Sequence, residues 1–247
     1  MLKLEEDILP KVIAVLGVGP GLGLSMAHRF GREGFAVALV SRSDTRHGTY
    51  RASLAEAGIT AHTYVADVTD EDQVSAVLKR INAEAGEIDT VYFGPADLSA
   101  GSAIVPLPEA DGDVLRASFD ALAVPAAGVV RAALPPMLAR GAGTLFFAGG
   151  LSGKYPMPML GSFGPAAAAL RMYVLTLNEA LRDKGIHAAT LTIGGVIERG
   201  DIHRFVAEQR AFDFEAGLLN PDDIAETAWT MYVDRDRAEA EFTKLPV

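Results

Sequence analysis

The sequence predicts an α/β protein in which a central parallel sheet is doubly wound, with helices on both faces. Three observations predict this class. Short apolar, β-branched runs alternate with longer segments of helical period. The first run leads directly into a glycine-rich turn, Gly17–Gly23, and then an amphipathic helix. Hydrophobic residues make up 49% of the 247 residues and charged ones 22%, which is enough apolar surface for a sheet covered on both sides.

The expected strands are the short apolar runs. They are Val12–Leu16, Ala36–Val40, Ala61–Val65, Thr90–Phe93, Thr144–Ala148 and Ala188–Ile193. Between the third and fourth runs, Val74, Val77, Leu78 and Ile81 recur at i, i+3, i+4 and i+7. This spacing predicts a helix whose apolar stripe packs on the sheet.

Two long helices are expected in the second half. One spans Val114–Ala139, interrupted at Pro125 and ending near Pro135-Pro136, because proline lacks a backbone donor and clashes with the preceding turn. The other spans Ala166–Asp183. Segment 194–219 is rich in charge and poor in period, so we expect a mobile segment beside the substrate.

The last predicted helix begins at Pro221, with Asp222 and Asp223 in its first turn, where prolines and acids favour a helix start. Nothing in the composition separates the halves, so residues 1–247 are interpreted as one domain.

Charge and composition exclude several classes. A formal net charge of −10 argues against a nucleic-acid partner. The absence of cysteine excludes disulfides and thiolate metal sites, and no spacing of His and carboxylates resembles a metal site. Lys3 and Glu5 precede any apolar run, unlike a secretory signal, and no unbroken apolar stretch approaches the roughly 20 residues that span a bilayer. We expect a cytoplasmic protein without a membrane partner.

The glycine-rich turn predicts a dinucleotide site. Its glycines let the backbone turn sharply and approach a pyrophosphate, and the helix that follows presents free N–H groups and a positive dipole end. The expected contacts are Gly17, Gly19, Gly21, Leu22 and Gly23. A glycine-rich stretch alone is often only a turn, but its place between a first strand and a helix favours the Rossmann type of site.

The second strand ends in Ser41-Arg42, without the acid that would bind the ribose 2′-hydroxyl of NAD. A guanidinium there can pair with a 2′-phosphate, which predicts NADP(H) as cofactor, whereas the alternative is an exposed loop arginine. The third strand is followed by Asp67, which either caps the next helix or lies at the edge where cofactors bind.

With these residues the chain resembles the short-chain dehydrogenase/reductase family over nearly its whole length. The matches are Gly17–Gly23, Ser41-Arg42, Asp67-Val68 and Gly185-Ile186. The resemblance implies a bond from Asp67 to the adenine amine and contact of the Val68 backbone with the ring. It also implies cofactor contacts at Gly94 and Pro95, and a homodimer or homotetramer formed through the two long helices.

The same resemblance implies that the catalytic residues are absent. Counting back from Gly185 places Phe163 at the family's proton-donating Tyr and Ala167 at its Lys. The family's Ser and Asn positions correspond to Gly150 and Leu122. None of these side chains can donate, accept or ionise. Phe163 keeps the ring volume of tyrosine, which indicates that the shape of the pocket is retained.

The loop after the fifth strand contains side chains that could replace the missing proton donor. Tyr155, with Ser152 close by, is the candidate catalytic residue, although Tyr155 before a proline is also typical of a packing residue. Lys154 is expected to point away from Tyr155, as neighbours on an extended loop do. Met157 and Met159 predict an apolar entrance or an oligomer contact.

His203, with Asp201 and Glu198 nearby in the chain, is either an acid–base group or part of the surface. Two functions are carried forward. The first is an NADPH-dependent reductase acting on a small hydrophobic carbonyl compound, with the proton supplied by Tyr155 or by the substrate. The second is a non-catalytic NADP(H)-binding protein, a sensor or structural partner. A lyase or cyclase is a third option that no residue selects.

Overall fold

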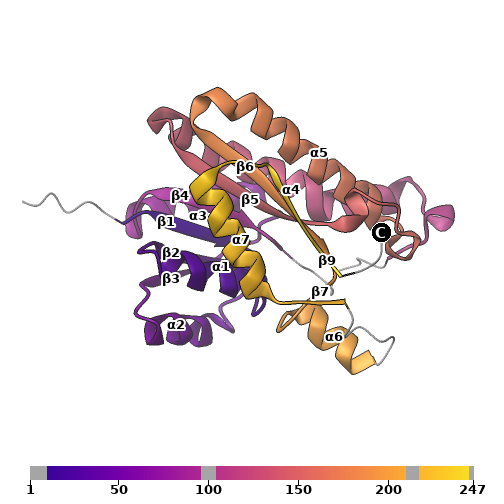
Figure 1. Ribbon diagram of the computed structural model, residues 1–247, viewed down its shortest axis with the longest axis horizontal. Coiled ribbons are helices and arrows are strands. Elements are labelled where there is room, and N and C mark those ends of the chain that lie inside the picture. Colours follow the sequence, from indigo (N-terminus) through magenta and orange to yellow (C-terminus); the bar gives the residue numbers. More distant parts are fainter. Residues whose placement is uncertain (1–9, 96–103, 210–216, 245–247) are drawn as a thin grey trace, which may run out of the picture.

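The central sheet of the protein has seven strands, all paired in parallel (Figure 1). The computed structural model describes residues 10–95, 104–209 and 217–244, and these are the described residues below. The strands are β1 Val12–Leu16, β2 Ala36–Ser41, β3 Ala61–Val65, β4 Ile88–Phe93, β5 Gly143–Gly150, β6 Ile186–Gly194 and β9 Glu239–Thr243. The predicted α/β class and the six predicted strands are confirmed.

The strand order is β3-β2-β1-β4-β5-β6-β9, so the winding reverses direction between β1 and β4. Neighbouring strands on either side of this point send their connections to opposite faces of the sheet. In folds of this kind ligands bind outside the carboxyl ends of the strands at such a reversal of the strand order.

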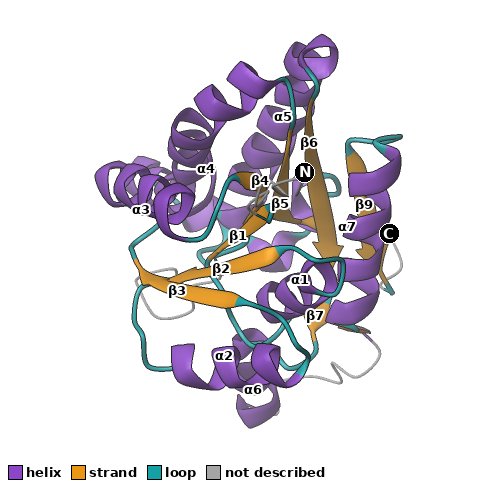
Figure 2. Ribbon diagram, turned by 90° about the vertical axis from the view of Figure 1, so that its left-hand side faces the viewer, coloured by secondary structure: helices purple, strands orange, loops and turns teal. Residues whose placement is uncertain are grey.

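Helices cover both faces of the sheet (Figure 2). The α-helices of the described residues are α1 Leu22–Gly31, α2 His47–Glu56, α3 Glu71–Glu84, α4 Gly112–Arg140, α5 Phe163–Leu181, α6 Asp201–Gln209 and α7 Pro221–Asp234. One buried cluster joins α3, α4 and α5 to the sheet, and the other joins α1, α2 and α7 to the opposite face. The stripe predicted around Val74 and Ile81 faces the first cluster.

Helix α4 matches the predicted range Val114–Ala139 to within two residues, but it runs unbroken through Pro125, Pro135 and Pro136, so the predicted interruption and the closure at the proline pair are wrong. A proline costs a helix one hydrogen bond and a steric clash, but packing against α3, α5, β4 and β5 holds the turns on both sides in place. Among the described residues α4 is also the one helix long and apolar enough to cross a bilayer, on length and composition alone.

Segment 194–219 contains regular elements that its sequence pattern did not predict, and its mobility stays a prediction. It contains β7 Val196–Ile197, α6 and β8 Leu218–Leu219, with β7 and β8 paired in a small second sheet. Residues 210–216 lie outside the described residues. Residues 198–201 of this segment lie close to the glycine-rich turn.

Strand β9, at the edge of the sheet beside β6, was not predicted. Its residues Glu239–Thr243 are all half-buried, and the two glutamates interrupt the apolar run by which buried strands are recognised.

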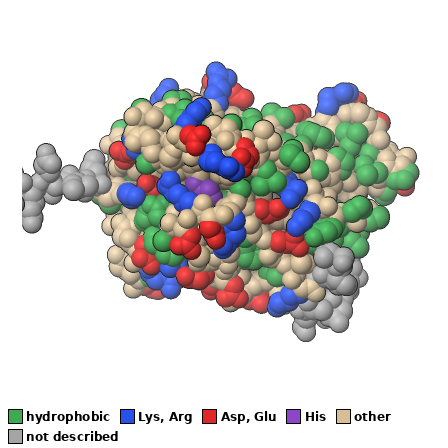
Figure 3. All heavy atoms as spheres, turned by 45° about the horizontal axis from the view of Figure 1, so that its top comes forward, with side chains coloured by type: hydrophobic (Ala, Val, Ile, Leu, Met, Phe, Trp, Pro, Cys, Tyr) green, Lys and Arg blue, Asp and Glu red, His purple; other side chains and the backbone are tan. Residues whose placement is uncertain are grey.

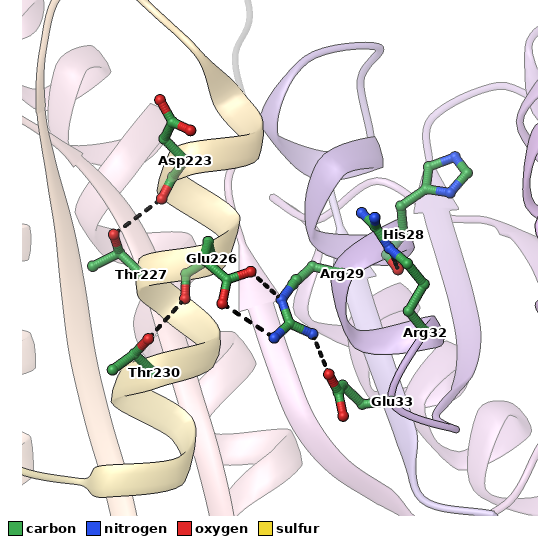
Figure 4. Close-up of polar contacts among 8 residues, drawn as sticks. All are labelled: His28, Arg29, Arg32, Glu33, Asp223, Glu226, Thr227 and Thr230. Atoms are coloured by element: carbon green, nitrogen blue, oxygen red, sulfur yellow. Dashed lines mark hydrogen bonds and ion pairs between the residues drawn. The ribbon is translucent and has the colours of Figure 1, made fainter.

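Side chains of α1 and α7 bond to each other (Figure 4). The Arg29 guanidinium donates to Glu226 at 2.5 Å and to Glu33 at 2.6 Å. It also lies over the Trp229 ring, 4.8 Å from the centroid. Phe30, fully buried, meets Trp229 edge to face. These contacts fix the helix that carries the glycine-rich turn at its start.

Candidate functional site

The glycine-rich turn lies between the tips of β2 and β4. Gly17 has a φ of +83°, a left-handed conformation that side chains rarely adopt. Its N–H and that of Val18 each donate to the Val40 carbonyl at 3.0 Å. On the other side, a Cβ on Gly17 would stand 2.7 Å from the Pro95 backbone. Both a positive φ and a close approach therefore require glycine here.

Helix α1 begins at the end of this turn. Gly21 occupies the N-cap position and gives no side-chain hydrogen bond, and Leu22 is buried beneath it. A Cβ on Gly23 would stand 3.1 Å from the Val18 Cα, so the helix packs closely on the turn. The first amides of α1 have no side-chain cap, and the helix dipole favours an anion at this end.

The tip of β2 is held by a hydrogen-bond network. Ser41 Oγ donates to the Ser43 carbonyl at 2.8 Å and lies 2.7 Å from His47 Nε2. Since Ser41 uses its proton on Ser43, His47 Nε2 is the donor of the second bond. Burial lowers the pKa of His47, which keeps the ring neutral. Arg42 is exposed beside this network.

Asp67 does not cap α3. Its Oδ1 accepts from the backbone N–H of Thr69 at 2.9 Å and from the Thr69 hydroxyl at 2.7 Å. The cap is Asp70, whose Oδ1 accepts from two first-turn amides at 3.0 Å. The capping alternative for Asp67 is therefore wrong, and Asp67 with buried Val68 remains at the carboxyl end of β3.

All of the sequence-predicted cofactor contacts lie at the carboxyl ends of four adjacent strands. The turn follows β1, Ser41-Arg42 ends β2, Asp67-Val68 follows β3, and Gly94-Pro95 follows β4. The Gly94 N–H donates to the Leu16 carbonyl at 3.0 Å. These residues, dispersed in sequence, border one continuous edge of the sheet.

A second group of predicted residues meets where β5 ends against α5. A Cβ on Gly153 would stand 2.6 Å from the Ala167 carbonyl, so the short helix Leu151–Gly153 is pressed onto α5. A Cβ on Gly150 would stand 3.8 Å from the Ala167 Cβ. Phe163, half-buried, begins α5, and Leu122 packs at the margin of the core.

Ser152 lies within this second group. A Cβ on Gly150 would stand 3.3 Å from the Ser152 hydroxyl oxygen. A Cβ on Gly164 would stand 3.8 Å from the Ser152 carbonyl oxygen. The structure therefore places a hydroxyl close to where a serine at position 150 would carry its own.

Tyr155 lies in a different environment. The Lys154 ammonium stands over the Tyr155 ring, 5.3 Å from its centroid, so the expectation that the two point apart is wrong. The reason is the helical turn that precedes them, because both backbone N–H groups donate to the Leu151 carbonyl. Lys154 also pairs with Glu241 on β9 at 2.6 Å. Tyr155 thus lies beside a lysine that pairs with the edge strand.

Sequence reasoning missed the contact of the 198–201 segment with the glycine-rich turn. A Cβ on Gly21 would stand 3.2 Å from the Glu198 carbonyl, and one on Gly19 would stand 3.9 Å from Asp201 Oδ2. The Arg199 N–H donates to His203 Nδ1 at 3.2 Å, which gives that histidine a local structural contact. No spacing signal could reveal a contact between residues this far apart in the chain.

Within the described ranges, no group of three or more His, Asp and Glu side chains could hold a metal ion. A parallel sheet with a switch point and a glycine-rich turn beside it defines a dinucleotide-binding α/β fold. Residues 11–207 match the sequence model of the short chain dehydrogenase family. The protein therefore belongs to the short-chain dehydrogenase family.

The chain is similar in sequence to individual proteins, and its fold is similar to that of solved structures. An uncharacterised oxidoreductase of Staphylococcus saprophyticus is 24% identical over 226 residues, covering 90% of this chain and 91% of its own. A short chain oxidoreductase from Pseudomonas aeruginosa, solved with NADPH bound and described as containing an atypical catalytic center, superposes with a TM-score of 0.82 at 19% identity over 94% of each chain. The NADPH and L-sorbose complex of L-sorbose reductase from Gluconobacter frateurii gives 0.80 at 20% identity over 95% of each.

Proposed function

We propose that this protein is an NADP(H)-dependent oxidoreductase that reduces the carbonyl group of a small hydrophobic substrate without the usual Tyr/Lys pair of its family. The observation that carries the proposal is the glycine-rich turn between the tips of β2 and β4, together with the exposed Arg42 at the tip of β2.

The residues present fit a dinucleotide. The amides at the start of α1 have no side-chain cap, and Gly17 gives the turn a conformation that other residues would strain. Arg42 offers a planar guanidinium to a 2′-phosphate. Gly94-Pro95 and Asp67-Val68 complete the border along which a bound dinucleotide would extend. When bound, NADPH supplies the hydride.

The proton must come from an unusual source. At the positions that match the family's catalytic residues stand Phe163, Ala167, Gly150 and Leu122, none of which carries a polar side chain. Loss of a positioned general acid costs about 10²–10⁴ in rate, whereas orientation of the two reactants supplies roughly 7–11 kcal/mol. Reduction is therefore slowed rather than abolished.

Ser152 is the donor that the geometry favours for the carbonyl oxygen. Its hydroxyl is 3.3 Å from the site of a Cβ on Gly150, and the tight packing of Gly153 on α5 holds it there. The hydroxyl donates a hydrogen bond to the carbonyl oxygen as negative charge develops. The proton that completes the alcohol comes from an acidic group of the substrate, or from Tyr155.

The test is consumption of NADPH at 340 nm with a panel of ketones, quinones and hydroxyaryl ketones. We expect turnover with some of these, a fall in kcat of about 10²–10³ for Ser152→Ala, and an unchanged Kd for NADPH. Tyr155→Phe tests the second donor. Ser162→Ala is the control for loss of a serine hydroxyl, because that serine is fully buried and its hydroxyl is not accessible to a substrate. The proposal fails if no compound is reduced, or if NADPH does not bind.

The second candidate function is NADP(H) binding without catalysis, as a sensor or a structural partner. It is favoured by the same four apolar side chains. Tight NADPH binding with no single-turnover oxidation by any compound in the panel would select it.

We also propose a homo-oligomer. An apolar groove on α5 is lined by Ala169, Met172, Tyr173, Thr176, Leu177 and Ala180. Met172 is 58% exposed there, which is typical of a surface that a second chain covers. On the face drawn in Figure 3 acidic and basic side chains are interspersed, and hydrophobic ones gather toward its right-hand end. Light scattering of the purified protein should show a dimer or tetramer, and Met172→Glu should shift it toward monomer.

A further inference from the structure

An ion pair joins α6 to α2 beside the proposed cofactor site. Arg46, at the N-cap position of α2, places Nη1 3.0 and 2.8 Å from the two carboxylate oxygens of Asp201, the first residue of α6. Arg204 also bonds to Asp201. Residues 155 positions apart are therefore held together at the edge where the cofactor is expected.

The Asp201 carboxylate lies next to the glycine-rich turn. A Cβ on Gly19 would stand 3.9 Å from Asp201 Oδ2, and a Cβ on Gly21 would stand 3.2 Å from the Gly200 backbone nitrogen. This is the uncapped end of α1, where the helix dipole favours a negative charge. Asp201 thus brings the protein's own carboxylate to the place where a phosphate would be attracted.

Arg46 has the position and the chemistry to bind a phosphate. It follows the Ser41-Arg42 tip of β2 by four residues, and the tip lies beside the turn because Val40 accepts from the turn's amides. The bonds to Asp201 and Tyr50 raise the pKa of Arg46 and so secure its charge. Its side chain is 49% exposed and that of Asp201 38%, so both are accessible to an incoming anion.

The segment that carries Asp201 has a separate anchor. Arg199 pairs with Asp222 at 2.8 Å and donates to Ser25 Oγ at 3.2 Å, and Ser25 donates to Asp222 at 2.7 Å. These bonds tie the segment to α1 and α7. A change at Asp201 should therefore alter the charge beside the turn without releasing the segment.

We propose that Asp201 acts as an internal anion that holds Arg46 and opposes cofactor binding, and that a phosphate of NADP(H) displaces it and takes Arg46 as a ligand. Arg46 is then a second cofactor-binding cation beside Arg42. The proposal rests on the proposed NADP(H) site. The phosphate can be the 2′-phosphate or the pyrophosphate, and the comparison of NADPH with NADH distinguishes them.

The expected change in the Kd of NADPH is modest, because the side chains of Arg46 and Asp201 are both partly exposed. Partly exposed ion pairs contribute little because water and salt screen them, and the same screening limits the repulsion between Asp201 and a bound phosphate. Asp201→Asn keeps the shape and removes the charge. We expect it to lower the Kd of NADPH by about two- to tenfold at low salt, and less at high salt.

The experiment is titration of the full-length protein with NADPH and NADH, followed by cofactor fluorescence and calorimetry. The variants are Asp201→Asn, Arg46→Gln and the double variant, with thermal unfolding to verify that each is folded. Glu208→Gln is the matched control, because it removes an equal charge two turns along the same helix. Arg46→Gln should weaken NADPH binding, and the gain from Asp201→Asn should be smaller in the double variant than in the wild-type background. An effect confined to NADPH assigns Arg46 to the 2′-phosphate, and an equal effect on NADH assigns it to the pyrophosphate.

The inference is overturned if the wild-type protein binds NADPH and Asp201→Asn binds it no more tightly than Glu208→Gln. It is equally overturned if Arg46→Gln leaves both affinities unchanged. If neither wild type nor any variant binds NADPH or NADH at millimolar concentration, the proposed function fails together with the inference.

Discussion

Replacement of Gly17 by alanine should damage both the fold and the cofactor site. The φ of +83° costs an L-residue about 1–2 kcal/mol. The new Cβ would also stand 2.7 Å from the Pro95 backbone, and forcing a methyl group into packed surroundings costs about 1–3 kcal/mol. The sum is a loss of about 2–5 kcal/mol in the free energy of unfolding. Displacement of the turn should raise the Kd of NADPH about tenfold or more.

The matched control is Gly34→Ala. Gly34 has a φ of +88°, but a Cβ there meets nothing within 4 Å, so only the backbone cost of about 1–2 kcal/mol applies. Any gain from a less flexible unfolded chain is common to both variants and cancels in the comparison. Urea unfolding gives the two free energies, and NADPH fluorescence gives the affinity. The reasoning is refuted if the two variants are equally stable, or if Gly17→Ala binds NADPH like the wild type.

Three further predictions concern the pocket, acid stability and β9. Gly150→Ser, added to Ser152→Ala, should restore part of the activity lost in the single variant, measured as kcat at saturating NADPH; no recovery would contradict the placement of the donor. Burial is the leading cause of a lowered pKa in three histidines, His28, His47 and His187. The unfolded chain therefore binds a proton on each histidine at a higher pH than the folded chain does. The free energy of unfolding should be greatest above pH 6.5, the ordinary histidine pKa, and should fall as the pH drops below it. Urea midpoints that do not change between pH 7.5 and 5.5 would exclude this. Glu239→Gln should cost about 1–3 kcal/mol in urea unfolding, because its half-buried carboxylate accepts bonds from α5 and β6, whereas Glu241→Gln should cost about 1 kcal/mol or less.

The cofactor edge of the site could be predicted because its signals are local. Gly17–Gly23 follows a strand directly, and Arg42 ends the next strand, so position along the chain implies position at the edge of a parallel sheet. The stripe from Val74 to Ile81 predicted a helix for the same reason: helical period is written in adjacent turns.

Other features escaped prediction because distant contacts create them. Pro125 predicts a break in α4, yet packing on both sides holds the helix together. The strand Glu239–Thr243 carries acids that become favourable only beside Lys154 and the arginine of α5. Ser152 and Tyr155 are near neighbours in sequence, but in the folded chain the Ser152 hydroxyl lies beside Gly150, whereas the Tyr155 ring lies beneath Lys154, which pairs with Glu241 of β9.

By itself the amino-acid sequence determined the parallel sheet, its winding and the glycine-rich turn, because strand and helix periods and glycine's backbone freedom act over a few residues. The tertiary structure alone decided that Asp201 lies against this turn and that Arg46 is its partner. Side chains 155 positions apart meet only when the sheet, α2 and α6 are packed together, and electrostatic attraction at about 3 Å then selects the pair.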